Sequence, residues 1–88
     1  MKNLKGVLIN TGGMYSYITI TSDSTVMIEG CTQIVECNEV LVKVLTKLFS
    51  VEVWGSGLAL NSFSNSTVSV TGSICSVGLE RRKAGEPL

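Results

Sequence analysis

The chain has 88 residues, seven basic and seven acidic side chains, and no histidine. This length corresponds to one small domain, and the zero net charge excludes the basic surface that nucleic-acid binding normally requires. The lack of histidine removes the most common general base and a frequent transition-metal ligand. Val, Ile and Thr together number 25, which favours strands because β-branched side chains suit a pleated sheet.

The domain organisation is simple. We expect a partly ordered N-terminal segment over residues 1–14, a single all-β domain over 15–80 and a flexible tail over 81–88. The apolar run at Val7-Leu8-Ile9 is too short for a signal peptide. Residues 53–79 carry no charge, but polar and apolar side chains alternate there, which excludes a membrane-spanning helix. We therefore expect neither a signal peptide nor a membrane span.

Short runs of alternating apolar and polar residues follow one another along the chain and predict strands. These runs lie near residues 17–21, 26–29, 50–54, 68–71 and 75–79. Turn-forming residues separate them at Asp23-Ser24, Asn38-Glu39, Gly55-Ser56-Gly57 and Ser64-Asn65-Ser66. The pattern predicts a small β-sandwich or a strongly coiled antiparallel sheet of about seven to eight short strands.

A short motif, V-x-[I/V]-x-G, occurs three times and ends at Gly30, Gly55 and Gly72. The spacings of 25 and 17 residues differ, which argues against a regular solenoid. We interpret the motif as three strands that each end at a glycine, where a bulge or sharp bend can precede the next strand.

The segment 39–49 fits two structures. Its three alternating valines favour a strand, whereas the leucines also fit helical spacing. As a strand it has apolar residues on both faces, with Leu41 and Leu45 opposite the valines. Such a strand is either covered on both sides or part of an interface.

Trp54 is the most informative single residue. The alternation places it on the face opposite Val51 and Val53, so it lies either on a contact surface or under a second layer of the domain. With Leu41 and Leu45 it forms our candidate interaction site.

The cysteines Cys31, Cys37 and Cys75 lack the close pairs typical of structural zinc sites. Their odd number is a poor disulfide framework, and we expect buried free thiols in a reducing compartment. We expect no catalytic residue, no cofactor and no metal site. A thiol would be the only candidate nucleophile, and the sequence offers no partner to activate it.

The order of residues resembles the YabP/YqfC family of small sporulation proteins, and its YqfC branch more closely. The resemblance covers about residues 18–79 and rests on segments such as Ile18-Thr19-Ile20, Val26-x-Ile28-Glu29, Val51-x-Val53-x-Gly55 and Val68-x-Val70-x-Gly72. The chain departs from that branch by having Gly30-Cys31 in place of Asn-His. Cys37 and Leu79 stand where aromatic residues are usual, and Phe49 replaces a glycine.

The resemblance implies a role in endospore formation, in the mother-cell cytoplasm, without enzymatic activity. The resemblance also implies a gene that lies beside those of membrane proteins of spore assembly, of the YqfD or YabQ type. We therefore expect a non-enzymatic all-β interaction module that docks on such a protein and also forms homo-oligomers. Two alternatives are a self-assembling structural β-protein without a sporulation role and a small-ligand or carbohydrate binder that uses Trp54, Tyr15 and Tyr17.

Overall fold

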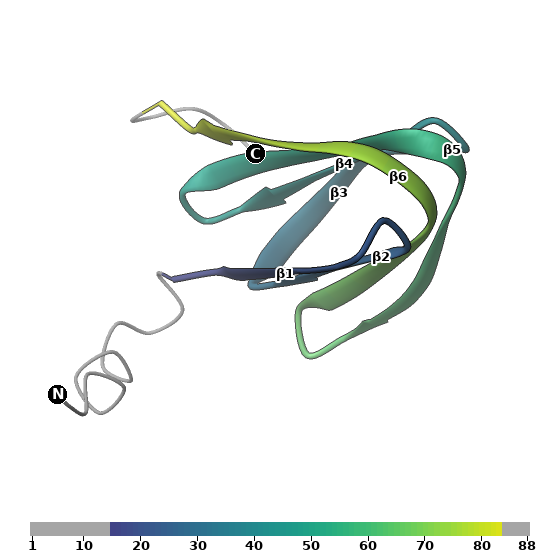
Figure 1. Cartoon of the computed structure of the whole chain (residues 1–88). Coiled ribbons are helices and arrows are strands. Elements are labelled where there is room, and N and C mark those ends of the chain that lie inside the picture. The colour runs from purple at the N-terminus through teal and green to yellow at the C-terminus, as the bar shows by residue number, and fades with distance from the viewer. Residues whose placement is uncertain (1–14, 84–88) are drawn as a thin grey trace, which may run out of the picture.

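The computed structural model describes residues 15–83 (Figure 1). These residues form six strands in one antiparallel sheet with the order β1-β2-β6-β5-β4-β3. The strands are β1 (Tyr17–Thr21), β2 (Thr25–Glu29), β3 (Cys31–Cys37), β4 (Leu41–Thr46), β5 (Phe49–Ser64) and β6 (Thr67–Arg81). The all-β, strongly coiled antiparallel sheet is confirmed, with six strands rather than seven to eight.

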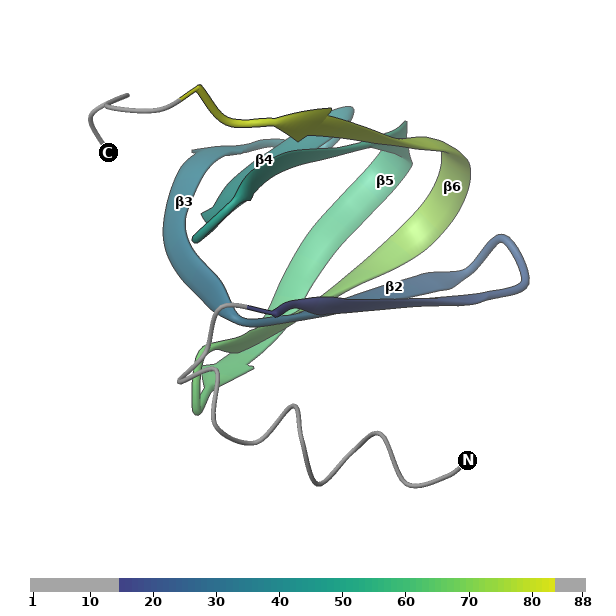
Figure 2. The ribbon, with the colours of Figure 1, turned by 90° about the vertical axis from the view of Figure 1, so that its left-hand side faces the viewer.

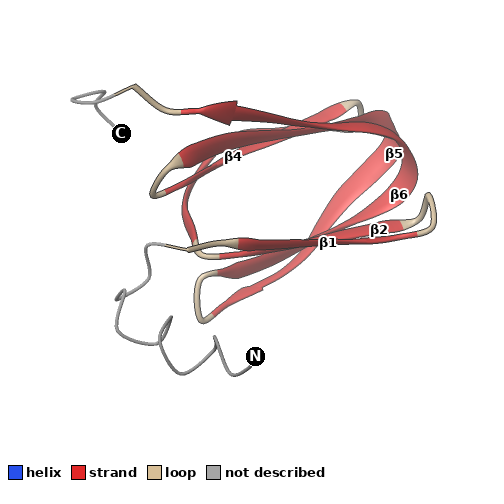
Figure 3. Ribbon diagram, turned by 60° about the vertical axis from the view of Figure 1, so that its left-hand side comes forward, coloured by secondary structure: helices blue, strands red, loops and turns tan. Residues whose placement is uncertain are grey.

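The sheet folds over itself so that the long β5–β6 hairpin belongs to both layers (Figure 3). The first part of β5 pairs with β4 and with the last part of β6. Beyond the bend, the first part of β6 pairs with β2 and with the last part of β5. One bent hairpin therefore joins an upper layer, β3-β4-β5-β6, to a lower layer, β1-β2-β6-β5.

Glycines make this bend possible. The β5–β6 pairing shifts register between Ser56 and Ala59, and Gly72 has a φ of +139°. A Cβ atom on Gly72 would lie 2.7 Å from the carbonyl oxygen of Gly57, and one on Gly55 would collide with the backbone of the facing strand. Only residues without a side chain permit this close approach of two backbones.

The expectation of a turn at residues 55–57 is wrong, because β5 continues through the bend as one strand. Gly55 and Gly72 likewise lie within strands and not at their ends. The expected turns at 23–24 and 38–39 do interrupt the strands, and the one expected at 64–66 does so at residues 65–66. The strands expected at 68–71 and 75–79 are likewise one strand, β6, which lowers the strand count.

Gly30 does end a strand, as the motif predicts. Its φ is +91°, and the backbone N–H groups of Gly30 and Cys31 both donate to the carbonyl oxygen of Ser66 at 2.9 Å. The chain thereby leaves β2, and Figure 2 shows β3 curving from the level of β2 up to β4.

The core lies between the two layers and consists mainly of valines. The fully buried members of the inner faces are Val26, Ile28, Val42, Val44, Val51, Val53, Val68 and Val70. Their spacing of two residues along each strand is the alternation seen in the sequence. Segment 39–49 is thus a strand, and its valines at positions 42 and 44 face the core. Each such side chain contributes about 1.5–3 kcal/mol by leaving water.

The last described residues are held against the β4–β5 connection. The backbone N–H of Arg82 donates to the carbonyl oxygen of Leu48 at 2.8 Å, and its guanidinium donates to that of Thr46 at 2.8 Å. The rest of the tail, residues 84–88, and the N-terminal segment 1–14 lie outside the described residues.

Candidate interaction surfaces

The outer face of the upper layer carries the three residues singled out from the sequence. Cross-strand pairing arranges this face in three rows, Leu41–Trp54–Ser76, Lys43–Glu52–Gly78 and Leu45–Ser50–Glu80. Leu41 and Trp54 are therefore direct cross-strand neighbours, while Leu45 lies in the third row. We call this surface the Trp54 face.

Trp54 is held in place in the first row of this face and remains 43 % exposed. Its indole N–H donates to the Oε1 atom of Glu52 at 3.1 Å, and Oε2 of the same carboxylate lies 3.6 Å from the Nζ atom of Lys43. The hydrogen bond uses the polar edge of the indole. The apolar ring thus remains available for contact with another molecule.

Leu45 differs from the other two candidate residues because it is only 8 % exposed. It lies outside the main core cluster, and its carbonyl oxygen accepts a hydrogen bond from the Thr32 hydroxyl at 3.1 Å. Leu45 therefore supports the β3–β4 packing, and the accessible apolar part of the face is Trp54 with the half-buried Leu41.

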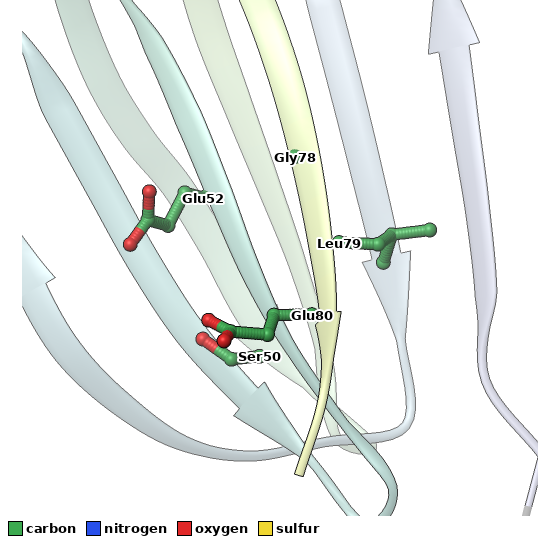
Figure 4. A pocket seen from close by; sticks show the side chains of 5 residues that line it. All are labelled: Ser50, Glu52, Gly78, Leu79 and Glu80. Atoms are coloured by element: carbon green, nitrogen blue, oxygen red, sulfur yellow. The ribbon is translucent and has the colours of Figure 1, made fainter.

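A hollow of about 160 Å³ lies on the same face and is lined by Glu52, the hydrogen-bond partner of Trp54, and by Ser50, Gly78, Leu79 and Glu80 (Figure 4). It lies over Gly78, where an added Cβ would meet nothing within 4 Å among the described residues. Ser50, Glu52 and Glu80 project to this side of the sheet, and Leu79 projects to the other. Small-molecule sites usually measure about 300–1,000 Å³, so the hollow fits one side chain of a partner protein better than a substrate.

The sequence reasoning did not identify Gly78 and Glu80 as part of this face. Their signal is the alternation along β6, which places Ser76, Gly78 and Glu80 on one side of the strand. A glycine between two polar residues on an outward face leaves a gap, but only the pairing with β5 places that gap opposite Glu52, in the row next to Trp54.

The chain belongs to the YabP family. The model of this family matches residues 13–86, which is most of the chain. Membership is consistent with a sporulation-related protein, and the match does not distinguish the YqfC-like branch. The comparisons with curated proteins and with solved structures found no significant match. Within residues 15–83, no helix is long and apolar enough to cross a membrane.

The aromatic residues of this YabP family protein do not form one ligand platform. Tyr17 lies on the outer face of the lower layer, since it alternates with Ile18, which packs against the core. Trp54 lies on the outer face of the other layer. Tyr15 lines a separate cavity of about 380 Å³ with Ser16, Leu48, Phe49 and Arg81. The three aromatic residues proposed for a carbohydrate site are thus on different parts of the surface.

The three thiols are free and differ in environment. Cys31 is buried, whereas Cys37 and Cys75 are exposed, so the expectation of three buried thiols is wrong for two of them. Burial raises the pKa of the Cys31 thiol, partly offset by a hydrogen bond with the backbone of Gln33. Among residues 15–83, no three His, Cys, Asp or Glu side chains lie close enough to hold a metal ion.

Proposed function

We propose that this YabP family protein acts in endospore formation as a non-enzymatic interaction module that docks on another protein through the Trp54 face. The observation that carries the proposal is the half-exposed Trp54, which pairs with Leu41 on the same face that carries the hollow over Gly78. The resemblance to the YqfC-like branch supports a membrane protein of spore assembly as the partner and the mother-cell cytoplasm as the location.

The chemistry of this face fits a protein partner. Tryptophan is enriched among the residues that dominate binding energy, especially where a pocket lies at the centre of the contact. Glu52 and Glu80 border the hollow, so a complementary partner presents basic groups around an apolar side chain. Lys43 forms an ion pair with Glu52, so we expect Glu80 to make the stronger contribution to this charge complementarity.

Deletion of the gene in its host, followed by a count of heat-resistant spores, tests the proposal. We expect the count to fall sharply and to recover when the wild-type gene is restored. The Trp54→Glu variant should fail to restore it, because a carboxylate cannot replace the apolar contact. The control is Val35→Glu on β3, where the replaced side chain is similarly exposed at 48 %; this variant should restore the spores.

The amount of each variant in the cell and its urea-unfolding midpoint show whether it folds. Spore counts restored by a folded Trp54→Glu variant would contradict docking through this face. A normal count after deletion of the gene would contradict the role in sporulation. We expect Leu41→Glu to behave as Trp54→Glu does, whereas Leu45→Glu should unfold the domain because that side chain is buried.

We also propose that the protein self-associates. The support is the zero net charge, which provides no long-range repulsion between copies, together with the two edge strands of the sheet, β1 and β3, each of which has a neighbour on one side only within residues 15–83.

A further inference from the structure

The two edge strands of the sheet differ in how well they are protected against pairing with other chains. The pairing of β3 with β4 has two register shifts, and β3 carries Glu36. Bulges and charges are devices that block edge-to-edge pairing. By contrast, all five residues of β1 pair in register with β2, and the strand has the uncharged sequence YITIT. Within the described residues, β1 has a neighbour on one side only.

Ile20 shows that the core face of the sheet is left partly uncovered at β1. It pairs with the fully buried Val26 and so lies on the core face of the sheet, yet it is 54 % exposed. The upper layer therefore does not cover the core face at the margin of β1. Tyr17, on the opposite face of the same strand, is also exposed. A large exposed side chain on each face thus borders the backbone edge of β1 that no other described strand covers.

We propose that β1 pairs antiparallel with β1 of a second copy of this chain, with a two-fold axis at Thr19. This deepens the proposed self-association by naming its surface, and it is independent of the Trp54 face. In this register Ile18 lies opposite the partner's Ile20 on the core face. Tyr17 lies opposite the partner's Thr21 on the outer face.

The strand is suited to a second copy because it is self-complementary. Antiparallel pairing about Thr19 brings the isoleucines together on one face, and the tyrosines and threonines together on the other. The strand has no charged residue that would repel the same strand of a second copy. The pairing continues the lower layer from one copy into the next and covers Ile20. The shared edge of five residues is only about 17 Å long, so the interface is small and we expect roughly micromolar affinity.

Sedimentation equilibrium of the full chain tests the proposal with two matched variants. The wild-type protein should pass from 9.4 kDa to twice that mass as its concentration rises. Ile20→Lys should raise the dissociation constant at least about tenfold, since an inward-pointing edge lysine blocks pairing. Ile34→Lys should leave it unchanged, because this residue is exposed to a comparable extent, 37 %, on the other edge strand.

Disulfide cross-linking tests the register. In a background with Cys37→Ser and Cys75→Ser, a Thr19→Cys variant should form a covalent dimer. Directly opposed residues have Cα atoms about 4.5–5.5 Å apart, which a disulfide can bridge. A Thr21→Cys variant should not form one, because the two copies of position 21 would lie about 14 Å apart along the strands.

Several results would overturn the proposal. The proposal is refuted if the wild-type protein stays monomeric at a protein concentration of several hundred micromolar. If its β1 amides were nevertheless all protected from hydrogen exchange, the edge would be paired with the chain's own N-terminal segment. A dimer that resists Ile20→Lys would leave self-association standing but remove β1 as its surface. Cross-linking through Thr21→Cys in preference to Thr19→Cys would refute the two-fold register.

Discussion

Replacement of Gly72 by alanine should strongly destabilise the fold, because this residue lies at the bend of the hairpin that joins the two layers. Its φ of +139° is a conformation that side-chain-bearing residues rarely adopt, and forcing one into it costs about 1–3 kcal/mol. The new Cβ would also lie 2.7 Å from the carbonyl oxygen of Gly57, and relieving such overpacking costs about 1–3 kcal/mol.

The two costs together give a loss of about 2–6 kcal/mol for Gly72→Ala, against about 5–15 kcal/mol for the whole stability of a typical domain. The lower figure already corresponds to a fall of about thirtyfold in the folding equilibrium constant. A shift of the backbone would also strain the hydrogen bond from the Gly72 N–H to the carbonyl oxygen of Ser24, 3.2 Å long. That bond connects the bend to the β1–β2 turn.

Gly78→Ala is the matched control, since it makes the same substitution in the same strand. A Cβ at position 78 would meet nothing within 4 Å among the described residues, so we expect stability to be unchanged or slightly increased. Urea unfolding at a fixed protein concentration, followed by the fluorescence of the single tryptophan, measures both variants. Equal unfolding midpoints for Gly72→Ala and Gly78→Ala would refute the steric account of the bend.

Further predictions concern the chain end and the buried thiol. Arg82→Ala should lower stability by about 1–2 kcal/mol in the same assay, because it removes a charge-assisted hydrogen bond to the carbonyl of Thr46. The control is Lys47→Ala, which replaces an exposed side chain. An equal loss of stability in the control would contradict the role of the hydrogen bond. The exposed Cys37 and Cys75 should react rapidly with a thiol reagent in the native protein, whereas the buried Cys31 should react only after unfolding. Because burial raises the pKa of Cys31, only the unfolded thiol ionises as the pH passes its ordinary value of 9.0. Stability should therefore fall above that pH, and this fall should be absent in Cys31→Ala.

The Trp54 face illustrates what could be predicted before the structure was known. Alternation placed Trp54 opposite the core valines, and the structure has it there. The same pattern placed Leu45 on the outward side of its strand, opposite the valines. It could not show that the Leu45 side chain is buried by its neighbours. Burial depends on neighbours that are distant in the chain, so a periodic pattern identifies a face without revealing what lies over it.

The sequence by itself determined the all-β class, the strand faces and the family resemblance. These properties depend on residue type and on a period of two, which are local features of the chain. Only the tertiary structure decided that the glycines at 55–57 and at 72 form one bend and not separate chain reversals. A glycine permits both outcomes, and the choice depends on the neighbouring β2 and β4 strands, which pair with opposite ends of the hairpin. The exposed edge of β1 has the same origin, because a strand becomes an edge only through the order in which the whole sheet assembles.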